Sequence, residues 1–220
     1  MNGIWVLLLL IGLSALPILA VLLWIRLRHF PIKLPWFLLG ILGGALSLGV
    51  AAILQSLFPK MGEATISILL FKIFIQIALT EELSRFGVLF LFFWGFRRIS
   101  KNQEFYTPAF SSLMGLIVGL GFAVIETAMY GVGNFRIALI RAVTAAPLHG
   151  ACGIRIGLGT YHLGDAPTLA LVRFLYAVGI HGIYNFMLVS PGIPVVFPVL
   201  IAFTALLSSM QMIRYSGSVV

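Results

Sequence analysis

Long apolar runs without a charged residue dominate this sequence. Residues 4–25 form one such run, and residues 34–58 form another. A transmembrane α-helix needs about 20 consecutive apolar residues, so each run is long enough to cross a bilayer. Hydrophobic residues make up 61% of the 220 positions and charged residues only 9%, whereas soluble domains have about 45–50% and about 25%. The composition excludes a soluble globular domain and predicts an integral membrane protein.

The rest of the chain continues this pattern and leaves little sequence for soluble parts. We predict further spans at residues 64–96, 108–130, 136–159 and 168–189, and a last span that ends at 213–214. No internal repeat is visible. These spans predict an all-α fold, a polytopic membrane helix bundle of about seven transmembrane helices. We expect residues 1–220 to form a single integral membrane domain.

The segment 64–96 has two interpretations. As one helix it would be about 50 Å long, against a hydrocarbon core of about 30 Å. It is either one tilted or broken helix, or two half-length segments joined near Thr80, which would make eight transmembrane helices. Basic residues favour the cytoplasmic side, and a single crossing puts the basic clusters at 26–33 and 97–101 on one side with Arg214. We therefore predict seven crossings, with the N-terminus outside and the C-terminus in the cytoplasm.

The net charge of +8, from 14 Lys+Arg against six Asp+Glu, does not indicate nucleic-acid binding. The basic residues lie mostly at the ends of apolar runs, where anionic lipid headgroups favour them. The lone cysteine, Cys152, excludes an internal disulfide. We expect the lipid bilayer as the surroundings of this chain and no nucleic-acid partner.

Charged side chains inside apolar spans indicate function, because each costs at least about 2.5–3.5 kcal/mol at mid-bilayer. The densest cluster is Glu81, Glu82 and Arg85. On a helix Arg85 lies four residues from Glu81 and three from Glu82, so it can pair with either. One cation cannot neutralise two carboxylates. One glutamate is then protonated, metal-bound or held as a base, unless the cluster is a structural ion pair.

Three later spans each add polar groups. Glu126 lies towards the end of the fourth span and His149 near the middle of the fifth. His181 shares a helix face with Asn185, four residues later, and such a pair suits stabilisation of an oxyanion. Taken alone, Glu126 is equally explained as an interfacial glutamate that reaches headgroup water, and a single histidine in a helix core is usually a satisfied hydrogen-bonding residue. Because the groups come from four helices, together they predict a wet intramembrane active site.

Small residues precede Glu126 in the fourth span. They are Gly115, Gly119, Gly121 and Ala123. Small residues let the backbones of membrane helices come close together. We predict that another helix packs tightly against this span.

Four motifs in order resemble the PrsW family of membrane-embedded endopeptidases. They are Glu81-Glu82-x-x-Arg85, Phe122-x-x-x-Glu126, Ala-Pro-Leu-His149 and His181-x-x-x-Asn185. The resemblance covers roughly residues 80–186, and the family is similar in turn to the clan of CAAX prenyl endopeptidases and bacteriocin-processing enzymes. Two positions depart from the pattern: PrsW-type sequences often have Lys at position 85 and Asn at position 127, where this chain has Arg and Thr.

The resemblance implies a hydrolase that cleaves a peptide bond of a membrane-anchored protein or peptide. It implies a catalytic core at about 64–189 and a location in a prokaryotic plasma membrane. We assign Glu81 as the base that activates water, and Glu82 as its companion, paired with Arg85. His181 and Asn185 would stabilise the tetrahedral oxyanion, and Glu126 and His149 would hold the water or carry the proton to the leaving amine.

Two questions stay open from the sequence: whether the protein binds a cofactor, and whether it is a protease. We expect no cofactor, with Zn²⁺ bound by Glu81, Glu126, His149 and His181 as the alternative. The sequence has no His-Glu-x-x-His helix. A proton-coupled transporter or channel would also use buried Glu and His groups, although the chain shows no repeat of the kind found in many transporters. A non-catalytic relative of the family is the third hypothesis.

Overall fold

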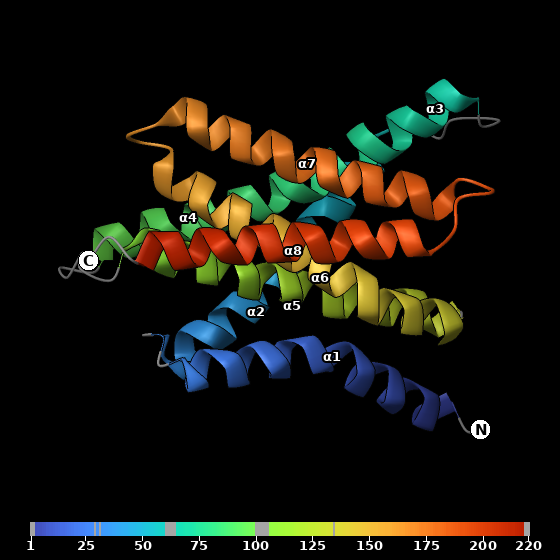
Figure 1. Ribbon diagram of the computed structural model, residues 1–220, viewed down its shortest axis with the longest axis horizontal. Coiled ribbons are helices and arrows are strands. Elements are labelled where there is room, and N and C mark those ends of the chain that lie inside the picture. The colour runs from blue at the N-terminus through green and yellow to red at the C-terminus, as the bar shows by residue number, and fades with distance from the viewer. Residues whose placement is uncertain are drawn as a thin grey trace.

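The computed structural model describes residues 3–28, 30, 32–59, 65–99, 106–133 and 135–217. Within these ranges the chain forms helices and no strand, which confirms the all-α prediction. The elements are α1 (Gly3–Leu27), α2 (Leu34–Ser56), α3 (Ile66–Phe71), the π-helix η1 (Lys72–Leu79), α4 (Thr80–Ile99), α5 (Pro108–Gly133), α6 (Phe135–His162), α7 (Pro167–Val189) and α8 (Val196–Gly217). They form an elongated bundle in which α1 begins at the end opposite to the one where α8 ends (Figure 1).

Four helices of the described chain are long and apolar enough to cross a membrane. They are Leu34–Ser56, Pro108–Tyr130, Pro167–Val189 and Val196–Arg214. Each coincides with a predicted span to within a few residues, so the protein is an integral membrane protein. The predicted span 136–159 lies inside α6, which carries three arginines. The total of seven crossings stays a prediction.

The segment with two interpretations is one continuous run of helix. It extends through α3, η1 and α4 from Ile66 to Ile99 without a break, and it changes its winding in the middle. The π-helix η1 ends at Leu79, directly before the acidic cluster. The hydroxyl of Thr80 donates to the carbonyls of Gln76 at 2.6 Å and Ile77 at 3.0 Å. π-Helical turns are frequent at functional sites, and this one ends two residues before Glu81.

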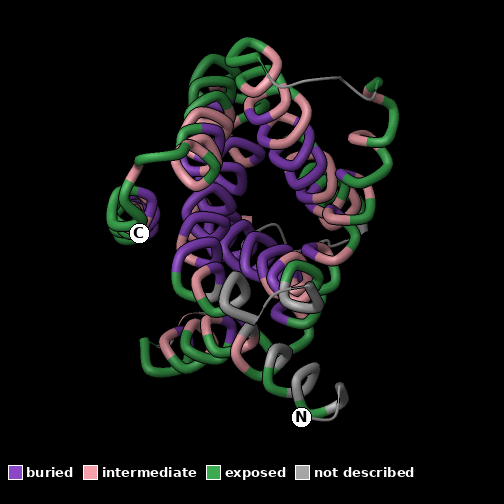
Figure 2. Tube along the Cα trace, turned by 90° about the vertical axis from the view of Figure 1, so that its right-hand side faces the viewer, coloured by how far each residue is buried: buried purple, intermediate pink, exposed green. Residues whose placement is uncertain are grey.

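The centre of the bundle is built from α5 and α6. Residues 110–123 of α5 and 148–160 of α6 are all buried, and Figure 2 shows that the buried parts of the helices face one another. A methyl group on Gly115 would overlap the carbonyl of Gly153, and one on Gly119 would overlap the carbonyl of His149. This confirms the close approach predicted from the small residues. The contact fixes α5, with Glu126, against α6, with His149.

Candidate active site

The acidic cluster begins the helix α4 and is buried. Glu82 and Arg85 are fully buried, and Arg85 Nη2 lies 2.8 Å from Glu82 Oε1 and 3.6 Å from Glu81 Oε2. Arg85 thus contacts both carboxylates, and Glu82 is its closer partner. Its guanidinium also lies 4.5 Å from the centre of the Phe122 ring on α5. The predicted pairing of Arg85 is confirmed.

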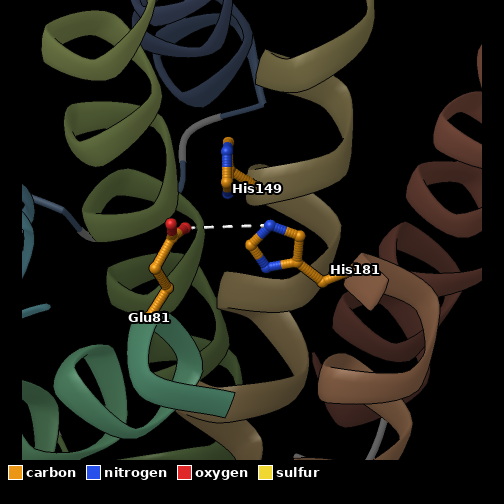
Figure 3. Close-up of side chains that lie close together, drawn as sticks. All are labelled: Glu81, His149 and His181. Atoms are coloured by element: carbon orange, nitrogen blue, oxygen red, sulfur yellow. Dashed lines mark ion pairs between the residues drawn. The ribbon is translucent and has the colours of Figure 1, made fainter. Parts of the chain in front are cut away.

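His181 reaches this cluster from α7. Its Nδ1 lies 2.7 Å from Glu82 Oε1, and its Nε2 lies 3.7 Å from Glu81 Oε2, the contact drawn in Figure 3. A carboxylate only accepts hydrogen bonds, so Glu82 holds the proton on Nδ1. The opposite ring nitrogen is then directed at Glu81. A gap of 3.7 Å is too long for a direct hydrogen bond and leaves the two atoms facing each other.

His149 on α6 also contacts a carboxylate through one ring nitrogen, in this case Nε2. Its Nε2 lies 2.8 Å from Glu126 Oε2 on α5, while its Nδ1 is buried without a hydrogen-bond partner in the described part of the protein. The rings of His149 and His181 meet edge to face, with centres 5.0 Å apart. One ligand-type atom each from Glu81, His149 and His181 lies within 4.8 Å of the others. These three side chains converge in Figure 3.

Glu126 lies behind His149 rather than in this group of three. Its Oε2 pairs with Arg141 Nη2 of α6 at 2.5 Å, and the Arg141 guanidinium stacks over the Tyr130 ring at 4.2 Å. The structure therefore brings three of the four alternative zinc ligands together and places the fourth, Glu126, as the partner of His149. Arg141 was missed by the sequence analysis. The available signal was a charged residue in an apolar span, eight positions before His149.

Gln55 borders the group, and Asn185 lies one turn beyond His181 on the same helix. Gln55 of α2 donates from Nε2 to Glu81 Oε1 at 3.3 Å, which the sequence analysis also missed because the residue is uncharged and at a helix end. Asn185 is half-buried, one turn beyond His181 on α7, and its side chain makes no hydrogen bond within the described ranges. Its predicted role at an oxyanion stays a prediction.

Buried atoms without partners show what the site still requires. Glu81 Oε2, Glu82 Oε2 and His149 Nδ1 are buried and lack hydrogen-bond partners in the part of the chain that the structure describes. Such atoms in a native structure call for a water or an ion. Polar groups from α4, α5, α6 and α7 thus meet at one place, as predicted. Between the two histidine rings and the Glu81 carboxylate they can bind a water or an ion.

Comparison with known proteins identifies a family to which the sequence belongs. Residues 31–209 match the sequence profile described as PrsW family intramembrane metalloprotease. No curated protein and no solved structure matches the chain. The match covers most of the sequence and includes every residue of the site. The chain therefore belongs to the PrsW family of intramembrane proteases.

Proposed function

We propose that this protein cleaves a peptide bond of a membrane-anchored protein or peptide with a water molecule that Glu81 activates. The observation that carries the proposal is the buried Glu81 Oε2, which makes no hydrogen bond within the described ranges and faces His181 Nε2 at 3.7 Å. A water that bridges these atoms can transfer a proton to the carboxylate while its oxygen attacks the carbonyl carbon. The product is a tetrahedral intermediate with a negative oxygen.

The histidines and their carboxylates would stabilise that intermediate. With protons on both of its ring nitrogens, His181 donates one hydrogen bond to Glu82 and one to the oxyanion. Asn185, one turn away, would donate a second. His149, oriented by Glu126, would carry the proton to the leaving amine. Arg85 and Arg141 hold the two carboxylates in place through the ion pairs described above.

The same residues fit a metal ion. Three carboxylates, those of the buried Glu81 and Glu82 and of the partly buried Glu126, face the two guanidinium groups of Arg85 and Arg141 in the described part of the protein, so the group has room for one more positive charge. Histidine ligands of metals usually bond a carboxylate through their other ring nitrogen, as both histidines do here. Glu81, His149 and His181 would hold the ion, and zinc in such a site supplies a bound water with a lowered pKa.

Chelation distinguishes these two forms of the mechanism. We expect the purified protein to keep its cleavage rate after prolonged treatment with a strong chelator, because Glu81 supplies the base. The measurement is the rate on a single-span reporter together with the zinc content of the sample by elemental mass spectrometry. A soluble zinc protease treated in parallel is the control. Loss of activity that stoichiometric zinc restores would replace the metal-free form by the zinc form.

The function class is tested in proteoliposomes that contain the protein and a single-span reporter. We expect a new reporter terminus within or beside its span, found by mass spectrometry, and no dissipation of an imposed pH gradient. A protease needs both elements in one bilayer, so liposomes with the reporter alone are the control. Dissipation of the gradient without cleavage would favour the transporter hypothesis instead.

The proposed function includes an orientation of the chain in the membrane and the extent of its catalytic core. We infer seven crossings with the C-terminus in the cytoplasm, a catalytic core at about residues 64–189, and a location in a prokaryotic plasma membrane. In support, α1 begins and α8 ends at opposite ends of the bundle. Substrate proteins would reach the site from the bilayer. The similarity to CAAX and bacteriocin-processing enzymes remains a prediction from the motifs.

A further inference from the structure

A third buried arginine lies outside the active site. Arg155 of α6 is only 4% exposed. Its Nη2 donates to Ser208 Oγ on α8 at 3.0 Å, and its Nη1 lies 3.6 Å from Met212 Sδ. Its guanidinium stacks over the Tyr176 ring of α7 at 4.3 Å, and its Nε has no hydrogen-bond partner within the described ranges. The contacts of this guanidinium with Ser208, Met212 and Tyr176 are thus all with neutral groups.

Arg155 differs from Arg85 and Arg141 because no carboxylate of the described residues pairs with it. Arg85 pairs with Glu82 and Arg141 with Glu126, whereas Arg155 forms no ion pair in the described part of the protein. A second cation adds to the imbalance, since Arg173 donates to the carbonyl of Leu158, one turn from Arg155. Buried charges in proteins are paired or bind a ligand. No described residue supplies such a partner for Arg155, which leaves room for an anionic ligand.

A cavity provides the space for that anion. It has a volume of about 350 Å³ and lies between α6, α7 and α8. Its polar wall consists of Arg155, Tyr176, Thr204 and Ser208, and its apolar wall includes Ile180 and Ile183. Tyr176 and Thr204 are exposed, so the cavity opens on the outside of the bundle. A ligand there meets a cation and hydroxyl groups at one side and aliphatic side chains at the other.

Arg155 lies close enough to one end of α6 for its side chain to reach lipid phosphates. With 28 residues, α6 is about 42 Å long, close to the full bilayer thickness of about 40–45 Å with headgroups. Arg155 lies seven residues before the end of α6 at His162, or about 10 Å. A long arginine side chain can reach from there to the headgroup region. A soluble anion would have to enter from the same side.

We propose that this cavity binds an anionic phospholipid, with its phosphate on Arg155. Ser208 accepts from Arg155, so its own O–H remains free to donate to a phosphate oxygen, as does the hydroxyl of Tyr176. An acyl chain lies along Ile180 and Ile183. These two residues flank His181 in the sequence of α7, so the lipid supports the helix that presents His181 to the active site.

The test is lipid binding by the full chain in neutral detergent, measured by native mass spectrometry. We expect wild type to bind phosphatidylglycerol more tightly than phosphatidylcholine, whose headgroup carries its own cation. Arg155→Met is expected to weaken phosphatidylglycerol binding by at least about tenfold, because it removes a buried charge partner. The matched control is Arg214→Met, an exposed arginine at the end of α8, which should leave the affinity unchanged.

A second variant covers the case that Arg155→Met does not fold. Thr204→Trp fills the mouth of the cavity from an exposed position and keeps the charge of Arg155, and it should also abolish binding. Unchanged phosphatidylglycerol binding in Thr204→Trp or in folded Arg155→Met would overturn the proposal. So would displacement of the lipid by an equal concentration of inorganic phosphate. Arg155-dependent binding of a peptide with a free C-terminal carboxylate, without binding of the lipid, would identify the site as one for substrate instead.

Discussion

Replacement of Glu81 by Gln is expected to reduce cleavage of a single-span reporter by about 10²- to 10⁴-fold, the usual contribution of a general base. The amide cannot take a proton from water, yet it has the size of the carboxylate and can still accept from Gln55 Nε2, which lies 3.3 Å from Glu81 Oε1. The fold should therefore persist. The measurement is the reporter cleavage rate in proteoliposomes, with the thermal unfolding midpoint recorded on the same sample.

The control for this variant is Leu83→Ala, on the same helix but at an exposed position. It should cleave at the wild-type rate. His181→Ala is expected to abolish cleavage as well, because it removes the ring between Glu81 and Glu82. Normal cleavage in both Glu81→Gln and His181→Ala would show that the reaction takes place elsewhere.

Replacement of Arg85 by Met is expected to lower the free energy of unfolding by about 3–5 kcal/mol, the cost of removing one partner of a buried ion pair. Arg85 is fully buried, and Glu82 Oε1 lies 2.8 Å from its Nη2. Without the guanidinium, the Glu82 carboxylate stays buried but loses the permanent cation that balances its charge. The measurement is denaturant unfolding of the purified protein in detergent micelles.

Three further variants test whether the loss of stability comes from the ion pair between Arg85 and Glu82. Arg98→Met removes an exposed arginine of the same helix that stacks over the Trp94 ring and should change stability by no more than about 1 kcal/mol. Arg85→Lys keeps the charge and should retain most of the stability. Adding Glu82→Gln to Arg85→Met should recover part of the loss, because the fully buried carboxylate at position 82 is then no longer left without its cation. A stability equal to that of Arg98→Met would show that the buried pair does not hold the fold.

The spans and the groups of the site could be read from the sequence for one physical reason. In a bilayer core, apolar side chains and internally bonded helices are favoured and isolated charges are costly. Residues 34–58 therefore indicated a helix, and the structure has α2 over Leu34–Ser56. Glu81, Glu126, His149 and His181 stood out for the same reason, and they meet in the structure.

The contacts that the sequence did not reveal join helices that spacing cannot relate. Glu126 and Arg141 are 15 residues apart on α5 and α6, and their pairing depends on how closely the glycines let those helices pack. Gln55 reaches Glu81 from α2 across 26 positions. The π-helix η1 was equally hidden, because its residues are as apolar as those of an ordinary span.

The amino-acid sequence alone determines which segments are apolar helices. It also identifies the side chains that are too costly to place in lipid without a partner. Both follow from the free energy of transfer out of water. Only the folded bundle settles the partners. It places His181 Nδ1 at 2.7 Å from Glu82 and leaves its Nε2 at 3.7 Å from Glu81, a difference set by the rotation of α7 against α4. Hydrogen bonds depend steeply on such distances, so the chemistry of this site is decided by how the helices pack.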